Sequence, residues 1–149
     1  MKLIYQKLRE DAIAPTKAHD NDMGFDLYLP EDCYIGSGER LTVPLGISVK
    51  FPELDFLYGI SIGGFIKEKS GLASKLGLSV LGGVIDPGYT GELKVVVINT
   101  CSDRIIVLNA GDKIAQLVVM PFMAFSDVEE GIVDRSTGRG DGGFGSTGK

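Results

Sequence analysis

The sequence predicts a single all-β domain, folded as a sandwich or a barrel. Its strand-like segments are short and rich in β-branched residues, and turn residues separate them roughly every 8–12 residues. The sequence shows no long amphipathic helical pattern and no repeat of solenoid period. A chain of 149 residues can bury one hydrophobic core, so it needs neither a disulfide framework nor a structural metal to fold.

The expected elements follow one another along the chain. Lys2–Leu8 alternates in polarity, and Leu93–Asn99 (LKVVVIN) is a continuous apolar run typical of a buried strand. The other expected strands are Leu41–Phe51, Leu57–Ile66, Arg104–Leu108 and Lys113–Met120. Only Ser70–Leu76 (SGLASKL) has a local helical pattern, so we expect one short helix there.

Composition excludes several classes of function. The net charge of −5 is opposite to that of a general nucleic-acid-binding protein. His19 is the single histidine, which excludes a multi-histidine metal site. Cys33 and Cys101 form no CxxC pair, so we expect reduced thiols and a cytoplasmic protein. We find no signal-peptide pattern and no apolar run of about 20 residues that could span a membrane.

The last fourteen residues differ from the rest of the chain. The stretch STGRGDGGFGSTGK holds six of the 21 glycines and one large apolar side chain, Phe144. It has too little apolar surface to pack as part of a core. We therefore expect a β-domain at residues 1–135 and a flexible C-terminal arm at residues 136–149.

Two early segments carry charged residues beside glycine. The string DMGFDL places Asp22 and Asp26 around a glycine, which fits either a turn entering a strand or a pair of functional carboxylates. The string KSGLA combines the cation Lys69, the hydroxyl of Ser70 and Gly71 at the start of the expected helix. It fits either an anion-binding nest or an ordinary helix start capped by serine.

The string GGVIDPGYTG combines an acid, an aromatic ring and glycines in one expected hairpin. Pro87-Gly88 suits a type II turn, which would bring two strand ends together and leave Asp86 and Tyr89 at the rim. A carboxylate beside an aromatic ring suits a general base near a flat ligand. The alternative is an aspartate that caps its own turn.

Two later segments could also contact a ligand. Gln116 interrupts the apolar run of GDKIAQL, either as a satisfied polar residue at a sheet edge or as a ligand contact. The arm carries Arg139 and Phe144 among Gly, Ser and Thr, and could wrap around phosphates, although it lacks the GxxxxGK[ST] pattern. A disordered linker is the alternative interpretation of the arm.

Taken in order, these five segments resemble a known enzyme family. The strings GFDL, KSGLA, GGVIDPGYTGE, GDKIAQL and RGDGGFGSTG are similar to the five motifs of the homotrimeric deoxyuridine triphosphatases (dUTPases). The resemblance implies a jelly-roll-like distorted β-barrel and a homotrimer with three active sites shared between subunits. It also implies hydrolysis of dUTP to dUMP and pyrophosphate with Mg²⁺, an activity that limits uracil incorporation into DNA and supplies dUMP for dTTP synthesis.

The resemblance further implies a role for each matching residue. Asp86 would orient and deprotonate the attacking water, and Tyr89 would lie against the deoxyribose. The backbone at Gly83, Val84 and Ile85 would bind the uracil edge. The triphosphate side would be formed by Lys69, Ser70, Gly71, Gln116 and Arg139, and Lys94 would lie near the nucleotide. Asp26 would act on the metal through water. Phe144 would cover the uracil, and Gly145, Ser146 and Thr147 would wrap the phosphates.

Two features depart from the family pattern. Lys69 stands where the family usually has arginine, and it keeps the charge but loses the planar, bidentate fork. The stretch from Tyr58 to Lys69 is several residues longer than usual, which fits either a longer strand pair or an insertion at the subunit interface.

Other functions remain to be weighed. A dCTP deaminase of the same superfamily would carry a glutamate where this chain has Val96, and the HxE…PCxxC string of a zinc deaminase is absent. A nucleotide-sensing module with a regulatory protein partner stays open. A plain β-scaffold would leave the five ordered motifs unexplained. The source could be a virus, in which case the protein would act in the interior of a host cell.

Overall fold

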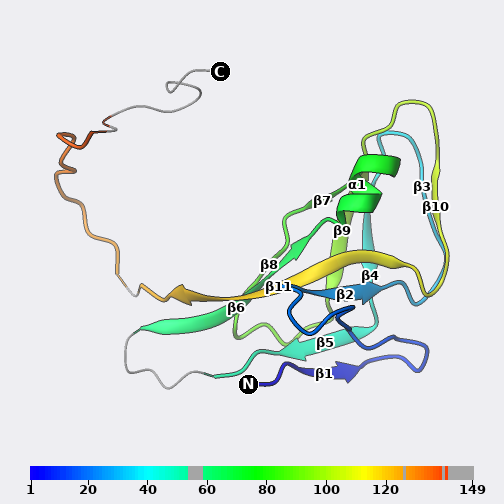
Figure 1. The fold of residues 1–149 in the computed structure, drawn as a ribbon, viewed down its shortest axis with the longest axis horizontal. Coiled ribbons are helices and arrows are strands. Elements are labelled where there is room, and N and C mark those ends of the chain that lie inside the picture. Colours follow the sequence, from blue (N-terminus) through cyan, green and yellow to red (C-terminus); the bar gives the residue numbers. More distant parts are fainter. Residues whose placement is uncertain (54–58, 126, 139, 141–149) are drawn as a thin grey trace.

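A computed structural model describes residues 1–53, 59–125, 127–138 and 140 (Figure 1). These residues form eleven strands and one short helix, so the all-β prediction is confirmed. The elements are β1 (Ile4–Lys7), β2 (Gly24–Tyr28), β3 (Cys33–Ile35), β4 (Arg40–Pro44), β5 (Ile47–Lys50), β6 (Ile60–Lys67), α1 (Ser70–Leu76), β7 (Leu78–Leu81), β8 (Val84–Ile85), β9 (Lys94–Asn99), β10 (Ile106–Leu108) and β11 (Lys113–Met123).

The strands pair in four small antiparallel sheets. The largest has the order β2-β11-β6-β8, and a second has the order β4-β9-β7. Two further pairs, β1 with β5 and β3 with β10, join strands that are distant in sequence. Together they give a jelly-roll-like β fold. Residues 127–138 contain no helix or strand and run away from the sheets (Figure 1).

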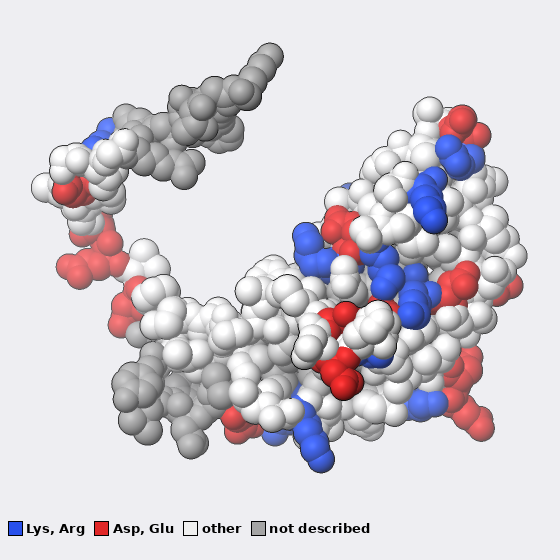
Figure 2. All heavy atoms as spheres, viewed as in Figure 1, with Lys and Arg blue, Asp and Glu red and all other residues white. Residues whose placement is uncertain are grey.

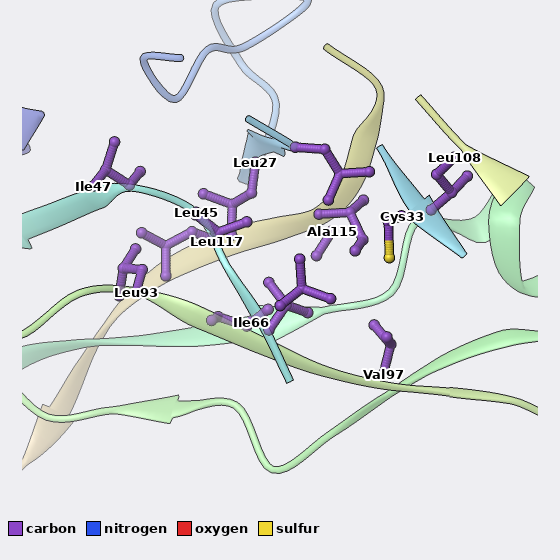
Figure 3. Close-up of a cluster of buried hydrophobic side chains, with 14 of the residues drawn as sticks. Leu27, Cys33, Leu45, Ile47, Ile66, Leu93, Val97, Leu108, Ala115 and Leu117 are labelled. Atoms are coloured by element: carbon purple, nitrogen blue, oxygen red, sulfur yellow. The ribbon is translucent and has the colours of Figure 1, made fainter. Parts of the chain in front are cut away.

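The sheets enclose one hydrophobic core (Figure 3). Its fully buried side chains come from all four sheets and include Leu27, Ile47, Leu78, Leu93, Val97, Ile106 and Leu117. Cys33 is also buried there as a free thiol, and burial raises its pKa, which keeps it protonated. Cys101 is a second free thiol, so the expectation of unpaired cysteines holds.

A buried asparagine joins three chain segments at one end of the core. The Asn99 side-chain amide donates to the carbonyls of Ile35 (3.0 Å) and Arg104 (2.8 Å). Its Oδ1 accepts the Cys101 backbone N–H at 2.9 Å. Asn99 therefore links β9 to β3 and to the loop before β10, with its amide fully satisfied.

One expected strand is divided in the structure and another is longer than expected. Leu41–Phe51 is divided into β4 and β5, because Gly46 between them has φ +68°. β11 passes Met120 and runs through Pro121 to Met123, where it pairs with β6 alone. Beyond Val118 its other side has no strand partner among the described residues, and a proline is tolerated on such an edge. The expected strands did not include β2, β3, β7 or β8.

The stretch before Lys69 contributes to a long strand pair. β6 pairs with β11 over eight positions, from Gln116↔Lys67 to Met123↔Ile60. Residues 54–58 of this stretch lie outside the described residues.

Candidate functional site

β7, β8 and the turn after β8 line a cavity of about 260 Å³. Within the described residues the expected hairpin across Pro87-Gly88 is not formed, because β8 pairs with β6 whereas β9 pairs with β4 and β7. We call the segment from β7 to Tyr89 the hairpin segment, after that expectation, and the cavity the hairpin pocket. Its lining consists of Ile66, Val80, Leu81, Gly82, Gly83, Val84, Ile85, Asp86, Tyr89, Lys94, Val95 and Val96. It brings together six of the residues singled out from the sequence: Gly83, Val84, Ile85, Asp86, Tyr89 and Lys94. Val96 keeps the wall apolar at the position where a deaminase would carry glutamate.

Two glycines bend the chain between β7 and β8. Gly82 has φ +68° and Gly83 has φ +98°, backbone conformations that other residues rarely adopt. The Gly83 carbonyl accepts the Ile66 N–H at 2.7 Å, and a Cβ at Gly83 would lie 2.5 Å from the Ile66 carbonyl oxygen. The bend therefore presses the backbone of Gly83 directly against β6.

The turn after β8 differs from the expected type. The Tyr89 N–H donates to the Asp86 carbonyl at 3.0 Å, which closes a four-residue turn around Pro87-Gly88. A type II turn requires positive φ at Gly88, and Gly88 does not have it, so that prediction was wrong. The Asp86 side chain is exposed and has no hydrogen bond or ion pair with the described part of the chain, so it is available to a ligand in the pocket.

Tyr89 is held on the opposite side of the turn. Its hydroxyl donates to the Glu92 carbonyl at 2.8 Å, and its ring lies over Gly91. The side chain stays partly exposed, so the ring can form one wall of the pocket. The hairpin thus presents an acid and an aromatic ring to the same space.

A second group of predicted residues lies around α1. A cavity of about 610 Å³, which we call the lysine cavity, lies beside α1. Its lining consists of Lys69, Gly71, Leu72, Lys75, Leu76, Leu108, Gly111, Asp112 and Lys113. Figure 2 shows basic side chains gathered between α1 and β2 on this face. The lysine cavity and the hairpin pocket share no lining residue.

A buried carboxylate holds two of these lysines. Lys69 donates to one oxygen of Asp26, and the Lys113 ammonium lies 2.7 Å from the other. The Asp26 side chain is 7% exposed, whereas those of Lys69 and Lys113 are 29% and 43% exposed. Burial alone would raise the pKa of Asp26, but the hydrogen bonds from Lys113 and Lys69 outweigh it and leave the pKa below its ordinary value. The bond to Asp26 raises the pKa of Lys113.

Gln116 and the helix start are also structurally defined. Gln116 lies on β11 between β2 and β6, so it is not at a sheet edge, and its amide donates to the Glu68 carbonyl at 2.8 Å. Lys69, not Ser70, occupies the N-cap, and no side chain caps the helix. The alternative of a helix start capped by Ser70 is therefore wrong. The Ser70 side chain is exposed next to Lys69.

Comparison with known proteins identifies the family. The sequence pattern of the dUTPase family matches residues 10–148. The chain belongs to the dUTPase family. It is 41% identical to the deoxyuridine 5'-triphosphate nucleotidohydrolase of Mycolicibacterium gilvum over 98% of this chain and 94% of that protein. It is 44% identical to the protein of the same name from Mycobacterium marinum, over 90% and 86% of the two chains.

Solved structures of other dUTPases share the fold. The dUTPase of Staphylococcus bacteriophage 80alpha with dUPNHPP superposes with a TM-score of 0.86 at 25% identity, covering 99% of both chains. A mutant of the dUTPase from phage phi11 of S. aureus, described with a structural Mg(II) ion, has a TM-score of 0.75 at 25% identity and covers 92% of this chain and 100% of that one. Family membership and this neighbour support use of a divalent metal.

The predicted site residues of the C-terminal arm lie outside the described residues. They are Arg139, Phe144, Gly145, Ser146 and Thr147. Sequence reasoning in turn missed Gly91, Glu92 and Lys113 as partners of the predicted residues, although each lies within one of the five strings. Within the described ranges, no helix is long and apolar enough to cross a membrane.

Proposed function

We propose that this protein hydrolyses dUTP to dUMP and pyrophosphate. The observation that carries the proposal is the hairpin pocket, where the Asp86 carboxylate, the Tyr89 ring and the glycine-bent backbone of β8 line one cavity. Together with membership of the dUTPase family, this pocket supports a site for one nucleoside triphosphate.

Asp86 is proposed as the general base. A carboxylate accepts a proton at neutral pH, and the exposed Asp86 can take it from a water molecule. The water oxygen then forms a bond to the α-phosphorus, and the bond from that phosphorus to the oxygen bridging the β-phosphate breaks. The electron pair leaves with pyrophosphate, so the protein must mainly align the water and neutralise charge.

The base and the sugar are proposed to be selected by shape. The backbone at Gly83, Val84 and Ile85 would hydrogen-bond the uracil edge and leave no room for a 5-methyl group. The Tyr89 ring would lie where a 2′-hydroxyl would have to fit. Both are steric exclusions, which discriminate by penalising the wrong nucleotide.

The phosphate-binding side is proposed to come from a second copy of the chain. Lys69, Ser70, Gly71 and Gln116 would bind the phosphates, but the hairpin pocket does not include them. A homotrimer in which the α1 region of one copy faces the hairpin pocket of the next would complete three equivalent sites. Lys94, which does line the hairpin pocket, would add a cation on the hairpin side.

The arm at residues 136–149 is proposed to close over this site. Arg139 would bind the γ-phosphate and Phe144 would cover the uracil. Gly145, Ser146 and Thr147 would wrap the phosphates, where glycine permits close approach of the backbone. The domain at 1–135 would remain the rigid platform.

Mg²⁺ is proposed as the metal. Within the described ranges, no three His, Cys, Asp or Glu side chains are grouped closely enough to hold an ion. Such a donor set fits a Mg²⁺ ion bound mainly by substrate phosphates and water. Because both oxygens of Asp26 are bonded to lysines, Asp26 would reach the ion only through water. When bound, the ion would neutralise charge on the phosphates.

A nucleotide panel tests the proposal. Pyrophosphate release with Mg²⁺ should be fast for dUTP and much slower for dTTP, dCTP and UTP. Asp86→Asn should abolish release but retain binding of a dUTP analogue, whereas Asp103→Asn, an exposed aspartate near the β9–β10 connection, should behave like the wild type. Equal turnover of dTTP, near-normal turnover by Asp86→Asn, or ammonia release from dCTP would each refute it.

A further inference from the structure

We propose that Glu92 and Gly91 are positioning residues that fix the Tyr89 ring and thereby set the discrimination between deoxyribose and ribose. This inference rests on the proposed function. It concerns residues that do not line the hairpin pocket and act on it only through Tyr89.

Two contacts fix the far end of the Tyr89 side chain. Its hydroxyl donates to the Glu92 carbonyl at 2.8 Å. Beside the same end of the ring, the space at Gly91 is so narrow that a Cβ there would lie 2.7 Å from the Tyr89 hydroxyl oxygen and 2.8 Å from Cζ. The ring therefore packs where only glycine leaves room, and the hydrogen bond selects one orientation of it.

Glu92 is in turn anchored to the connection between β4 and β5. Its Oε1 accepts the Gly46 N–H at 2.9 Å. The next residue, Leu93, is fully buried, donates to the Ile47 carbonyl at 2.7 Å and accepts from Leu45 at 3.0 Å. The carbonyl that receives the Tyr89 hydroxyl thus belongs to a backbone held from both the side chain and the following residue.

Gly46 completes the anchor. It has φ +68°, and a Cβ there would lie 2.5 Å from Cγ of Arg9. The N–H that Glu92 receives therefore comes from a tightly packed turn, which has little freedom to follow a moving side chain. The path from this turn to the pocket has two hydrogen bonds, Gly46 to Glu92 and Tyr89 to Glu92.

A ring rejects a 2′-hydroxyl only if it cannot turn away. A free ring would yield to ribose at the cost of one side-chain rotation, whereas a tethered ring must also break its hydrogen bond. Loss of the tether should therefore increase turnover of UTP relative to dUTP. In Glu92→Ala, where the changed side chain does not line the pocket, kcat for dUTP should change little.

Three variants and one matched control test the proposal. Tyr89→Phe removes the donor, and Glu92→Ala removes the anchor; each should lower the ratio of kcat/KM for dUTP to that for UTP about fivefold. Glu92→Gln keeps an oxygen acceptor for Gly46 and should restore the ratio. In the control, Glu39→Ala, the lost glutamate also accepts a backbone N–H, from Gly36 at 2.6 Å, but far from the hairpin in sequence. It should lose comparable stability with no change in the ratio.

A second readout does not depend on activity. In NMR spectra of protein with ¹³C-labelled tyrosine, the Tyr89 ring signals should show a slowly moving ring in the wild type and in Glu92→Gln. In Glu92→Ala the ring should move faster, so that the signals of its two edges are averaged. Failure of the wild type to hydrolyse dUTP would refute the proposed function and leave this readout decisive for the tether. An unchanged ring signal in Glu92→Ala, or an unchanged dUTP-to-UTP ratio in an active Tyr89→Phe and Glu92→Ala, would overturn the inference.

Discussion

The two adjacent glycines of the hairpin allow a direct test of how the pocket is shaped. Gly82 and Gly83 both have positive φ, so alanine at either position incurs backbone strain of about 1–2 kcal/mol. They differ in their surroundings, since a Cβ at Gly82 would meet nothing within 4 Å, whereas one at Gly83 would lie 2.5 Å from the Ile66 carbonyl oxygen. Gly82→Ala is therefore the matched control for Gly83→Ala.

The overlap at Gly83 cannot be relieved by a side chain, because the opposing atom belongs to the backbone of β6. Restoring ordinary van der Waals contact requires a displacement of roughly 1 Å, which would break the 2.7 Å bond between the Ile66 N–H and the Gly83 carbonyl. Loss of that bond adds about 1 kcal/mol to the strain. A shift of this size in a site that positions its ligand can reduce function about 100-fold.

The assay is calorimetric titration with a non-hydrolysable imido analogue of dUTP, together with urea unfolding at one fixed protein concentration. Gly82→Ala should bind within about threefold of the wild type, whereas Gly83→Ala should bind at least about tenfold more weakly. The free energy of unfolding of Gly83→Ala should be lower than that of the wild type by about 2–3 kcal/mol. Wild-type affinity in Gly83→Ala would refute the claim that the hairpin backbone shapes the binding pocket.

Two further perturbations test the structure around the site. Asp26→Asn should lower the free energy of unfolding at pH 7 by about 1–3 kcal/mol, because it leaves two partly exposed lysines without their carboxylate. Since the pKa of Asp26 is lowered in the folded state, its contribution is complete above pH ~4 and is lost as pH falls further, so wild type and variant should converge in acid unfolding curves. A difference that persists unchanged at pH ~2 would contradict this. Asn99→Ala should lower the free energy of unfolding, measured in urea, by about 2–4 kcal/mol, because it removes three hydrogen bonds in the core. A loss below about 1 kcal/mol would show that Asn99 does not hold those three segments together.

Local patterns made part of this structure predictable. The helix at Ser70–Leu76 has the limits that its sequence indicates, because its start after Lys69 and its end at Gly77, with φ +68°, are encoded locally. The approach of Asp86 to Tyr89 was also predictable, since both lie within one turn. The five ordered strings identified the family before any geometry was known.

Other features depend on residues that are distant in the chain. The break at Gly46 is coupled to Glu92, which lies 46 positions later. The continuation of β11 through Pro121 depends on where β2 stops pairing, a fact about another strand. The pairing of Asp26 with Lys113 requires the register of β2 on β11, including its irregularity between Lys113 and Ala115. No local pattern contains these relationships.

The most direct test of the account is complementation between two inactive variants. Asp86→Asn lacks the proposed base, and Ser70→Ala lacks a proposed phosphate contact; each alone should release little pyrophosphate from dUTP. If every site of a trimer takes its hairpin pocket from one copy and its α1 region from the next, co-folding equal amounts should restore about one quarter of the wild-type sites. Pyrophosphate release near that level is the predicted result. Activity no higher than the sum of the two variants folded separately would contradict the shared site.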